Sequence, residues 1–178
     1  MYKDVVSLDA SRTPSFVAGD FNGDGSQDIA IAVKPAKDKL EQINSEVAGW
    51  MIRDALSGTG IELVTMKRNS QAPNTRPIIT ERDETLLAII HGHGHAGWHD
   101  PEAQQTFLVK NAGLSSMRTQ TKKSLRAANK NKMLPPLLGD VLNATFAGEA
   151  GFLFYTGSSY EWYNARTYQG EIAKRMPH

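Results

Sequence analysis

Residues 19–29 read Gly-Asp-Phe-Asn-Gly-Asp-Gly-Ser-Gln-Asp-Ile, a run of oxygen-bearing side chains broken by glycines. Counted from Asp20, side-chain oxygens stand at the first, third, fifth and ninth positions. Isoleucine and valine then alternate with alanine until Pro35, which is typical of a β-strand. Residues 14–34 are therefore predicted to form a β-hairpin with an unusually polar loop, and this hairpin decides the fold class.

The chemistry of the loop favours calcium. Calcium takes roughly six to eight oxygen ligands at about 2.3–2.6 Å, and glycine lets a backbone turn tightly with positive φ. The predicted ligands are Asp20, Asn22, Asp24, the carbonyl of Ser26, and Asp28. The alternative is a turn rich in Asp and Asn that binds no metal.

The loop also resembles a known family. An EF-hand would carry Glu at the twelfth position, where this chain has Ile31. The run from Gly19 to Ile29 instead resembles the calcium loop of FG-GAP repeats, which occur in integrin α-subunit propellers and in many exported bacterial proteins. The resemblance implies two antiparallel strands around the loop, the five calcium ligands named above, and a secreted, periplasmic or cell-envelope location after removal of a signal peptide. The motif occurs once, whereas a propeller repeats it in each blade.

Further strands are predicted from short apolar runs. Near the C-terminus, Gly-Glu-Ala-Gly and Thr-Gly-Ser-Ser separate three such runs, which predicts a β-meander over about 139–165. The stretch from Gly139-Asp140-Val141 to Glu161-Trp162-Tyr163 also resembles the tail of uncharacterised exported bacterial proteins with one such loop. Leu40, Ile43 and Val47 stand at helical spacing, so the fold class is mainly β, or α+β with one short helix, with antiparallel sheets. The predicted strands are Ile61–Met66, Thr85–Ile90, Thr106–Lys110, Val141–Phe146, Gly151–Thr156 and Ser159–Tyr163.

The length fits one domain over residues 1–178, and the predicted strands make that domain β-rich. Composition then excludes some classes of function. The chain is 40% hydrophobic and 22% charged, with a net charge of +1 and no cysteine, so disulfides and thiolate metal sites are excluded. The longest apolar run, Leu86 to Ile90, is far shorter than the roughly 20 residues that a membrane helix needs. No membrane span is expected.

A histidine cluster suggests a second metal site. His91, His93 and His95 follow an apolar run, and alternate residues of an extended segment share a face, so three imidazoles can converge on zinc. A metal-dependent hydrolase using this site is the alternative function. The segment superficially resembles the His-x-His-x-Asp-His motif of metallo-β-lactamase-like hydrolases, but Ala96 stands where the last histidine belongs. The preferred interpretation of the cluster is a glycine-rich surface loop, and adventitious capture of nickel or zinc by surface histidines is a further alternative.

Other features are weaker. The segment from residue 115 to 133 carries six basic residues and no aromatic one, so nucleic-acid binding is not favoured. Aromatic residues near the C-terminus, which are Tyr160, Trp162, Tyr163 and Tyr168, suit either core packing or stacking on a sugar or peptide. Neither a Gly-x-Ser-x-Gly elbow nor a phosphate-binding Gly-Lys-Ser/Thr loop occurs. The sequence therefore predicts a non-enzymatic, calcium-binding interaction module with a protein or carbohydrate partner.

Overall fold

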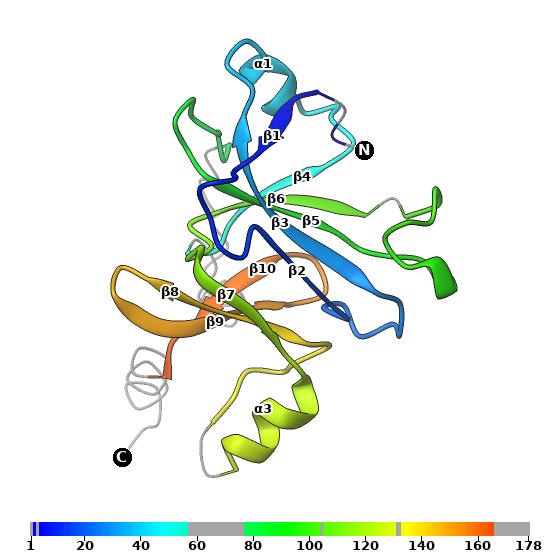
Figure 1. Ribbon diagram of the computed structural model, residues 1–178, viewed down its shortest axis with the longest axis vertical. Coiled ribbons are helices and arrows are strands. Elements are labelled where there is room, and N and C mark those ends of the chain that lie inside the picture. Colours follow the sequence, from blue (N-terminus) through cyan, green and yellow to red (C-terminus); the bar gives the residue numbers. More distant parts are fainter. Residues whose placement is uncertain (1, 3, 57–76, 104, 131–132, 166–178) are drawn as a thin grey trace, which may run out of the picture.

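The chain forms two β-sheets, one above the other in Figure 1. This computed structural model describes residues 2, 4–56, 77–103, 105–130 and 133–165. The predicted fold class, mainly β or α+β with one short helix and antiparallel sheets, is confirmed as β-rich with two largely antiparallel sheets. The strand predicted over Ile61–Met66 lies outside the described residues, as does Tyr168.

The larger sheet has the FG-GAP-like hairpin on one side and the apolar strands at its centre. β3 (Asp28–Pro35) pairs with both β1 (Val6–Leu8) and β2 (Phe16–Gly19) and continues to β5 (Leu86–Ile90). Next come β6 (Thr106–Lys110) and β4 (Met51–Asp54). Every pair is antiparallel except β4 with β6. The predicted hairpin and both predicted apolar strands are therefore present.

The central strands are apolar throughout because both faces of the larger sheet are covered. Leu87, Ile89 and Phe107 face a core shared with the smaller sheet. Leu86 and Leu108 face the opposite side, where the N-terminal segment packs. A strand buried on both sides reads as an unbroken apolar run rather than as an alternating one.

The short helix α1 (Leu40–Ile43) helps to cover that opposite side. Its Ile43 is fully buried, as the helical spacing predicts. The helix ends at Ile43, however, and Val47 is 92% exposed. Val47 therefore does not continue the predicted apolar face, because the chain leaves the helix one turn too early.

The smaller sheet is the predicted meander with one further strand. Its order is β10 (Tyr160–Tyr163), β9 (Glu149–Tyr155), β8 (Val141–Phe146) and β7 (Ser115–Gln120), all antiparallel. Helix α3 (Lys122–Ala128) follows β7. Thr121 caps its N-terminus, because the Thr121 hydroxyl accepts a hydrogen bond from the Ser124 N–H. The helix lies below this sheet in Figure 1.

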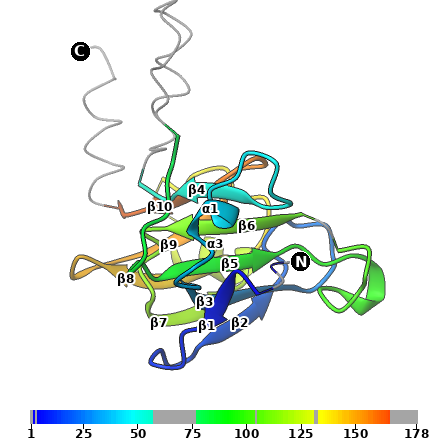
Figure 2. The same cartoon turned by 90° about the horizontal axis from the view of Figure 1, so that it is seen from above.

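The two sheets are joined through the hairpin and a common core. That core includes Phe21 from the loop of the hairpin, Leu87 from the larger sheet, and Leu153 from the smaller sheet. Figure 2 shows β2 lying beside β7. Here the Thr119 hydroxyl donates a 2.7 Å hydrogen bond to the carbonyl of Ala18. The hairpin thus lies at the junction of the sheets.

Among the described residues, no helix has the length and apolarity needed to cross a membrane.

Candidate metal-binding loop

The acidic loop connects β2 to β3, and the pairing of Gly19 with Asp28 closes it. It therefore presents its residues at the end of a rigid two-stranded ladder. Gly23 and Gly25 have φ values of +80° and +87°, which side chains other than glycine rarely adopt. A side chain at Gly23 would also collide with the carbonyl oxygen of Leu138. These requirements explain the glycines of the motif.

Three oxygen-bearing side chains surround the mouth of the loop. The carboxylate of Asp20 accepts hydrogen bonds from the N–H groups of Gly23 at 2.8 Å and Gly25 at 3.1 Å. The carbonyl of Asn22 accepts one from the Asp24 N–H at 3.0 Å, and the Asp24 carboxylate accepts one from the Ser26 N–H at 2.7 Å. These bonds are exposed to solvent, and they hold the side chains over the loop backbone.

Electrostatics keep Asp24 ionised. Burial alone raises the pKa of its carboxyl, but hydrogen bonds from the Ser26 N–H and from the Asn22 amide outweigh that effect. The net pKa lies below its usual value. The loop therefore presents a charged carboxylate at neutral pH.

Asp28 occupies a different position, beneath the loop. Its side chain is fully buried. One carboxylate oxygen accepts hydrogen bonds from the N–H groups of Phe21 at 2.7 Å and Asn22 at 3.2 Å, and the other accepts one from Gly92 at 2.8 Å. Burial raises the pKa of this carboxyl, although the N–H donors oppose the shift. Asp28 thus organises the loop from below and links it to the segment that follows β5.

The loop is held between two other segments of the chain. The Trp98 N–H donates to the Gln27 carbonyl at 2.8 Å on one side. On the other side, Asp140 donates its N–H to the Asp20 carbonyl at 2.7 Å and accepts from the Asp20 N–H at 3.3 Å. Neither contact is visible in a local sequence pattern, since the partners are more than 70 residues away along the chain.

The donor set fits a hard cation in its chemistry. Asp20, Asn22 and Asp24 supply oxygens at the exposed mouth, and each oxygen retains lone pairs beyond those used by the backbone N–H groups. No group of three or more His, Cys, Asp or Glu side chains is arranged to hold a metal in the described ranges. At this loop the Asp28 carboxylate accepts backbone N–H groups of Phe21, Asn22 and Gly92. A cation here would draw on two carboxylates, the Asn22 amide and backbone carbonyls.

A comparison with protein-family models identifies a known repeat at this hairpin. Residues 13–42 match the FG-GAP repeat. The match covers β2, the acidic loop, β3 and all but the last residue of α1, so the FG-GAP segment is a single repeat within the chain. Searches of curated proteins and of solved structures gave no significant match. The predicted resemblance is confirmed for this segment.

The three histidines are not brought together. His91 is buried, its Nδ1 lying 2.6 Å from Gln105 Oε1 and its Nε2 lying 2.6 Å from the Tyr160 hydroxyl. Burial lowers the pKa of this imidazole, which fits a neutral ring that donates to Gln105 and accepts from Tyr160. Both ring nitrogens are therefore already paired within the core.

His93 and His95 lie at the surface, in and beside the single 3₁₀ turn η1 (Gly94–Ala96). The strand ends at Ile90, so the alternation of faces on which the zinc prediction rested does not extend through the cluster. The structure gives no support to the zinc site or to the hydrolase built on it. In the described part of the chain, His91 serves as a core residue between the two sheets.

The fold also shows where the C-terminal aromatic residues and the basic segment 115–133 lie. Tyr160 and Tyr163 are buried in two different clusters, whereas Trp162 is only half-buried. Core packing therefore accounts for the two tyrosines. The basic segment forms β7 and α3, and its described cations are mainly exposed. Sequence reasoning missed Gln105 and Asp140, because isolated polar residues give no signal of a buried contact far along the chain.

Proposed function

We propose that this chain is a calcium-stabilised β module of an exported or cell-envelope protein, and that it works by binding a partner rather than by catalysis. The observation that carries the proposal is the FG-GAP match on a hairpin whose loop presents Asp20, Asn22 and Asp24 at its mouth. In this proposal those side chains and the carbonyl of Ser26 hold the ion. Asp28 as a fifth ligand stays a prediction, since it also supports the loop backbone.

The place of the loop in the fold supports a stabilising role for the ion. The loop contacts segments that precede β6 and β8, and its Phe21 is buried in the core between the sheets. A cation that draws the loop oxygens together would therefore strengthen contacts of both sheets. Binding of a protein or carbohydrate partner is proposed because the segment 13–42 matches the FG-GAP repeat, which suggests an interaction module.

The experiment is a thermal melt of the full chain in EDTA and in millimolar calcium. Extracellular calcium modules bind with dissociation constants of about 0.1–1 mM. Ten millimolar calcium then stabilises the folded state by roughly 1.4–2.7 kcal/mol. For a chain of this size that corresponds to a rise in Tm of about 3–10 °C. An identical Tm in the two buffers would sink the proposal.

A matched pair of variants assigns the effect to the loop. Asp24→Asn keeps an oxygen that can accept from Ser26 but removes a charge from the mouth, so the calcium-dependent rise in Tm should shrink. Asp38→Asn removes the same charge from an exposed site outside the loop and should keep the full rise. If both variants respond to calcium like the parent protein, the ion binds elsewhere.

A further inference from the structure

The outer face of the smaller sheet is divided into an apolar part and a polar part. Leu125 of α3 and Leu137 pack over one part of this face, against Phe152, Phe154 and Tyr163. The neighbouring part is an open hollow of about 280 Å³. Its lining comes from β7, β8 and β9 and consists of Ser116, Arg118, Gln120, Asn143, Ala144, Thr145, Ala150 and Gly151.

The hollow contains one cation. Arg118 is exposed and lies opposite Asn143 in the register of β7 and β8. Among the described residues, its guanidinium has no hydrogen bond or ion pair. A guanidinium offers five N–H donors in a planar fork that matches a carboxylate in a two-point contact. An uncommitted fork beside neutral polar groups is therefore suited to a ligand with a single negative charge.

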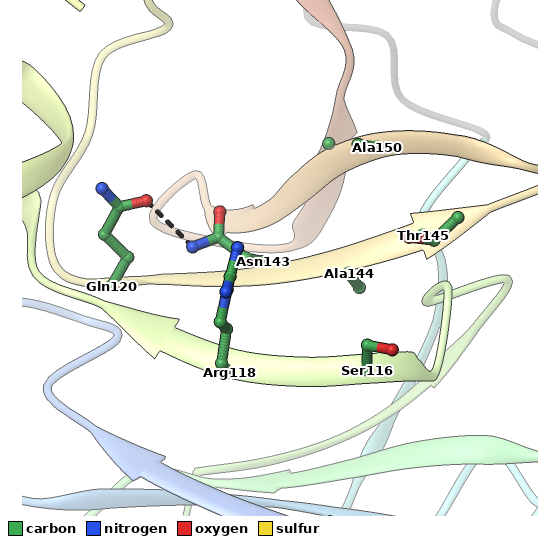
Figure 3. Close-up of a pocket in the computed structure, with 8 residues that line it drawn as sticks. Ser116, Arg118, Gln120, Asn143, Ala144, Thr145 and Ala150 are labelled. Atoms are coloured by element: carbon green, nitrogen blue, oxygen red, sulfur yellow. Dashed lines mark hydrogen bonds between the residues drawn. The ribbon is translucent and has the colours of Figure 1, made fainter. Parts of the chain in front are cut away.

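Two carboxamides next to Arg118 are held in place by each other. The Asn143 amide donates a 2.9 Å hydrogen bond to Gln120 Oε1, as Figure 3 shows. The Asn143 side-chain carbonyl oxygen accepts no hydrogen bond from the described residues, and each amide keeps N–H capacity. Orientation of these groups before binding reduces the entropy that a ligand must overcome.

Two hydroxyls complete the lining. Figure 3 shows Ser116 and Thr145 at the other end of the hollow from Gln120. Ser116 has a φ of +59°, and the pairing of β7 with β8 shifts register between Ser115 and Arg118. Such a bulge changes the direction of neighbouring side chains. Hydroxyls both donate and accept, so they complement the hydroxyl groups of a ligand.

We propose that this hollow binds a small hydroxylated carboxylate of the hexuronate class, with Arg118 on the carboxylate and with Gln120, Asn143, Ser116 and Thr145 on the hydroxyl groups. A phosphate group carries about 1.5 to 2 negative charges at neutral pH, which one arginine does not balance, whereas the single charge of a carboxylate is matched. The small volume favours one sugar unit rather than an extended chain.

This inference rests on the proposed function in one respect, since it names the ligand site of the calcium-stabilised module. The two are physically connected. The hollow lies on β7, whose Thr119 contacts β2 of the FG-GAP segment, and Asp140 links Asp20 of the loop to the first N–H of α3.

The test is a calorimetric titration of D-galacturonate into the full chain in calcium buffer. We expect saturable binding with a millimolar or lower Kd, and binding at least about tenfold weaker for D-glucose, which lacks the carboxylate, and for acetate, which lacks the hydroxyls. Inorganic phosphate should not displace galacturonate. Equal affinity for glucose, no heat with galacturonate, or competition by phosphate would each overturn the proposal.

Variants locate the binding. Arg118→Gln should weaken galacturonate binding at least about tenfold, and Arg118→Lys should also weaken it because a lysine cannot form the two-point contact. Arg126→Gln, an exposed arginine on α3 outside the hollow, is the matched control and should bind like the parent. Parent-like affinity in both Arg118 variants would place the ligand elsewhere. A melt of each variant checks that it is folded.

The outcomes separate the two proposals. A calcium-dependent Tm without galacturonate binding removes the ligand site and leaves the calcium module. Galacturonate binding that Arg118→Gln abolishes, in a protein whose Tm ignores calcium, supports the ligand site and removes the calcium role.

Discussion

The most informative perturbation is Asp28→Ala, studied in the absence of calcium. The carboxylate is fully buried and accepts three backbone N–H groups, of which those of Phe21 and Gly92 are themselves buried. Alanine leaves both without an acceptor. An unsatisfied buried donor costs about 1–3 kcal/mol, which gives roughly 2–6 kcal/mol for the pair.

Removal of a buried charge offsets part of this loss. Burial raises the pKa of Asp28, so the ionised form is less stable in the folded chain than in water. We therefore expect a net loss near the lower half of the range, about 3 kcal/mol. Asp28→Asn keeps one acceptor oxygen and should fall between the parent and the alanine variant.

The assay is equilibrium urea denaturation in EDTA with the m value held in common. With m near 2 kcal/mol per molar urea, a loss of about 3 kcal/mol lowers the midpoint by about 1.5 M. Asp24→Asn is the control, because its exposed oxygen can still accept from Ser26, and it should change the free energy of unfolding by under about 0.5 kcal/mol. A loss below about 1 kcal/mol for Asp28→Ala, or an equal loss for both positions, would refute the division between a supporting Asp28 and a ligating mouth.

Two further predictions concern the rest of the core. A hydrogen bond from the Ser11 hydroxyl is the main reason that the pKa of Asp9 falls from its ordinary value of 3.8 to about 2. Burial opposes this shift, and the Ser11 N–H and Lys34 add to it. Ionised Asp9 thus stabilises the fold above about pH 4, and this contribution disappears as pH falls toward 2. Asp9→Asn should lower the free energy of unfolding by about 1 kcal/mol at pH 7 and by almost nothing at pH 2. The loss at pH 7 is modest because Lys34 is half-exposed. Urea denaturation at each pH measures both values. Tyr160→Phe leaves Nε2 of buried His91 without its partner and should cost about 1–3 kcal/mol in the same assay, whereas an unchanged midpoint would mean that the ring finds another donor.

Local patterns were sufficient for much of the fold. The β2–β3 hairpin, β5, β6 and the meander were predictable because each is encoded within its own short run of apolar and turn residues. Helix α1 was predictable in position but not in length, since Val47 continues the spacing without finding a core to pack against. The helical spacing of apolar residues indicates a preference for burial, but it does not show whether a core is present for each of them to pack against.

Part of the candidate site could likewise be predicted from local sequence, and part depends on distant contacts. The mouth of the loop follows from the order of Asp, Asn and Gly. The role of Asp28 depends on Gly92, 64 residues away, and no pattern around Asp28 announces that contact. The histidine cluster was misleading for the complementary reason. His93 and His95 suggest an ion shared with His91, whereas the hydrogen-bond partners of His91 are Gln105, just before β6, and Tyr160 of β10.

The FG-GAP segment is hydrogen-bonded to segments far away in the chain, and this determines whether it can fold alone. A peptide of residues 13–42 would carry every oxygen of the motif yet lack Gly92, Trp98 and Asp140, which hold the turn in shape. We therefore do not expect the isolated segment, or the segment transplanted into another protein, to keep this loop conformation. Because those contacts join positions far apart in the chain, loop-closure entropy opposes each of them until the distant segments are brought together.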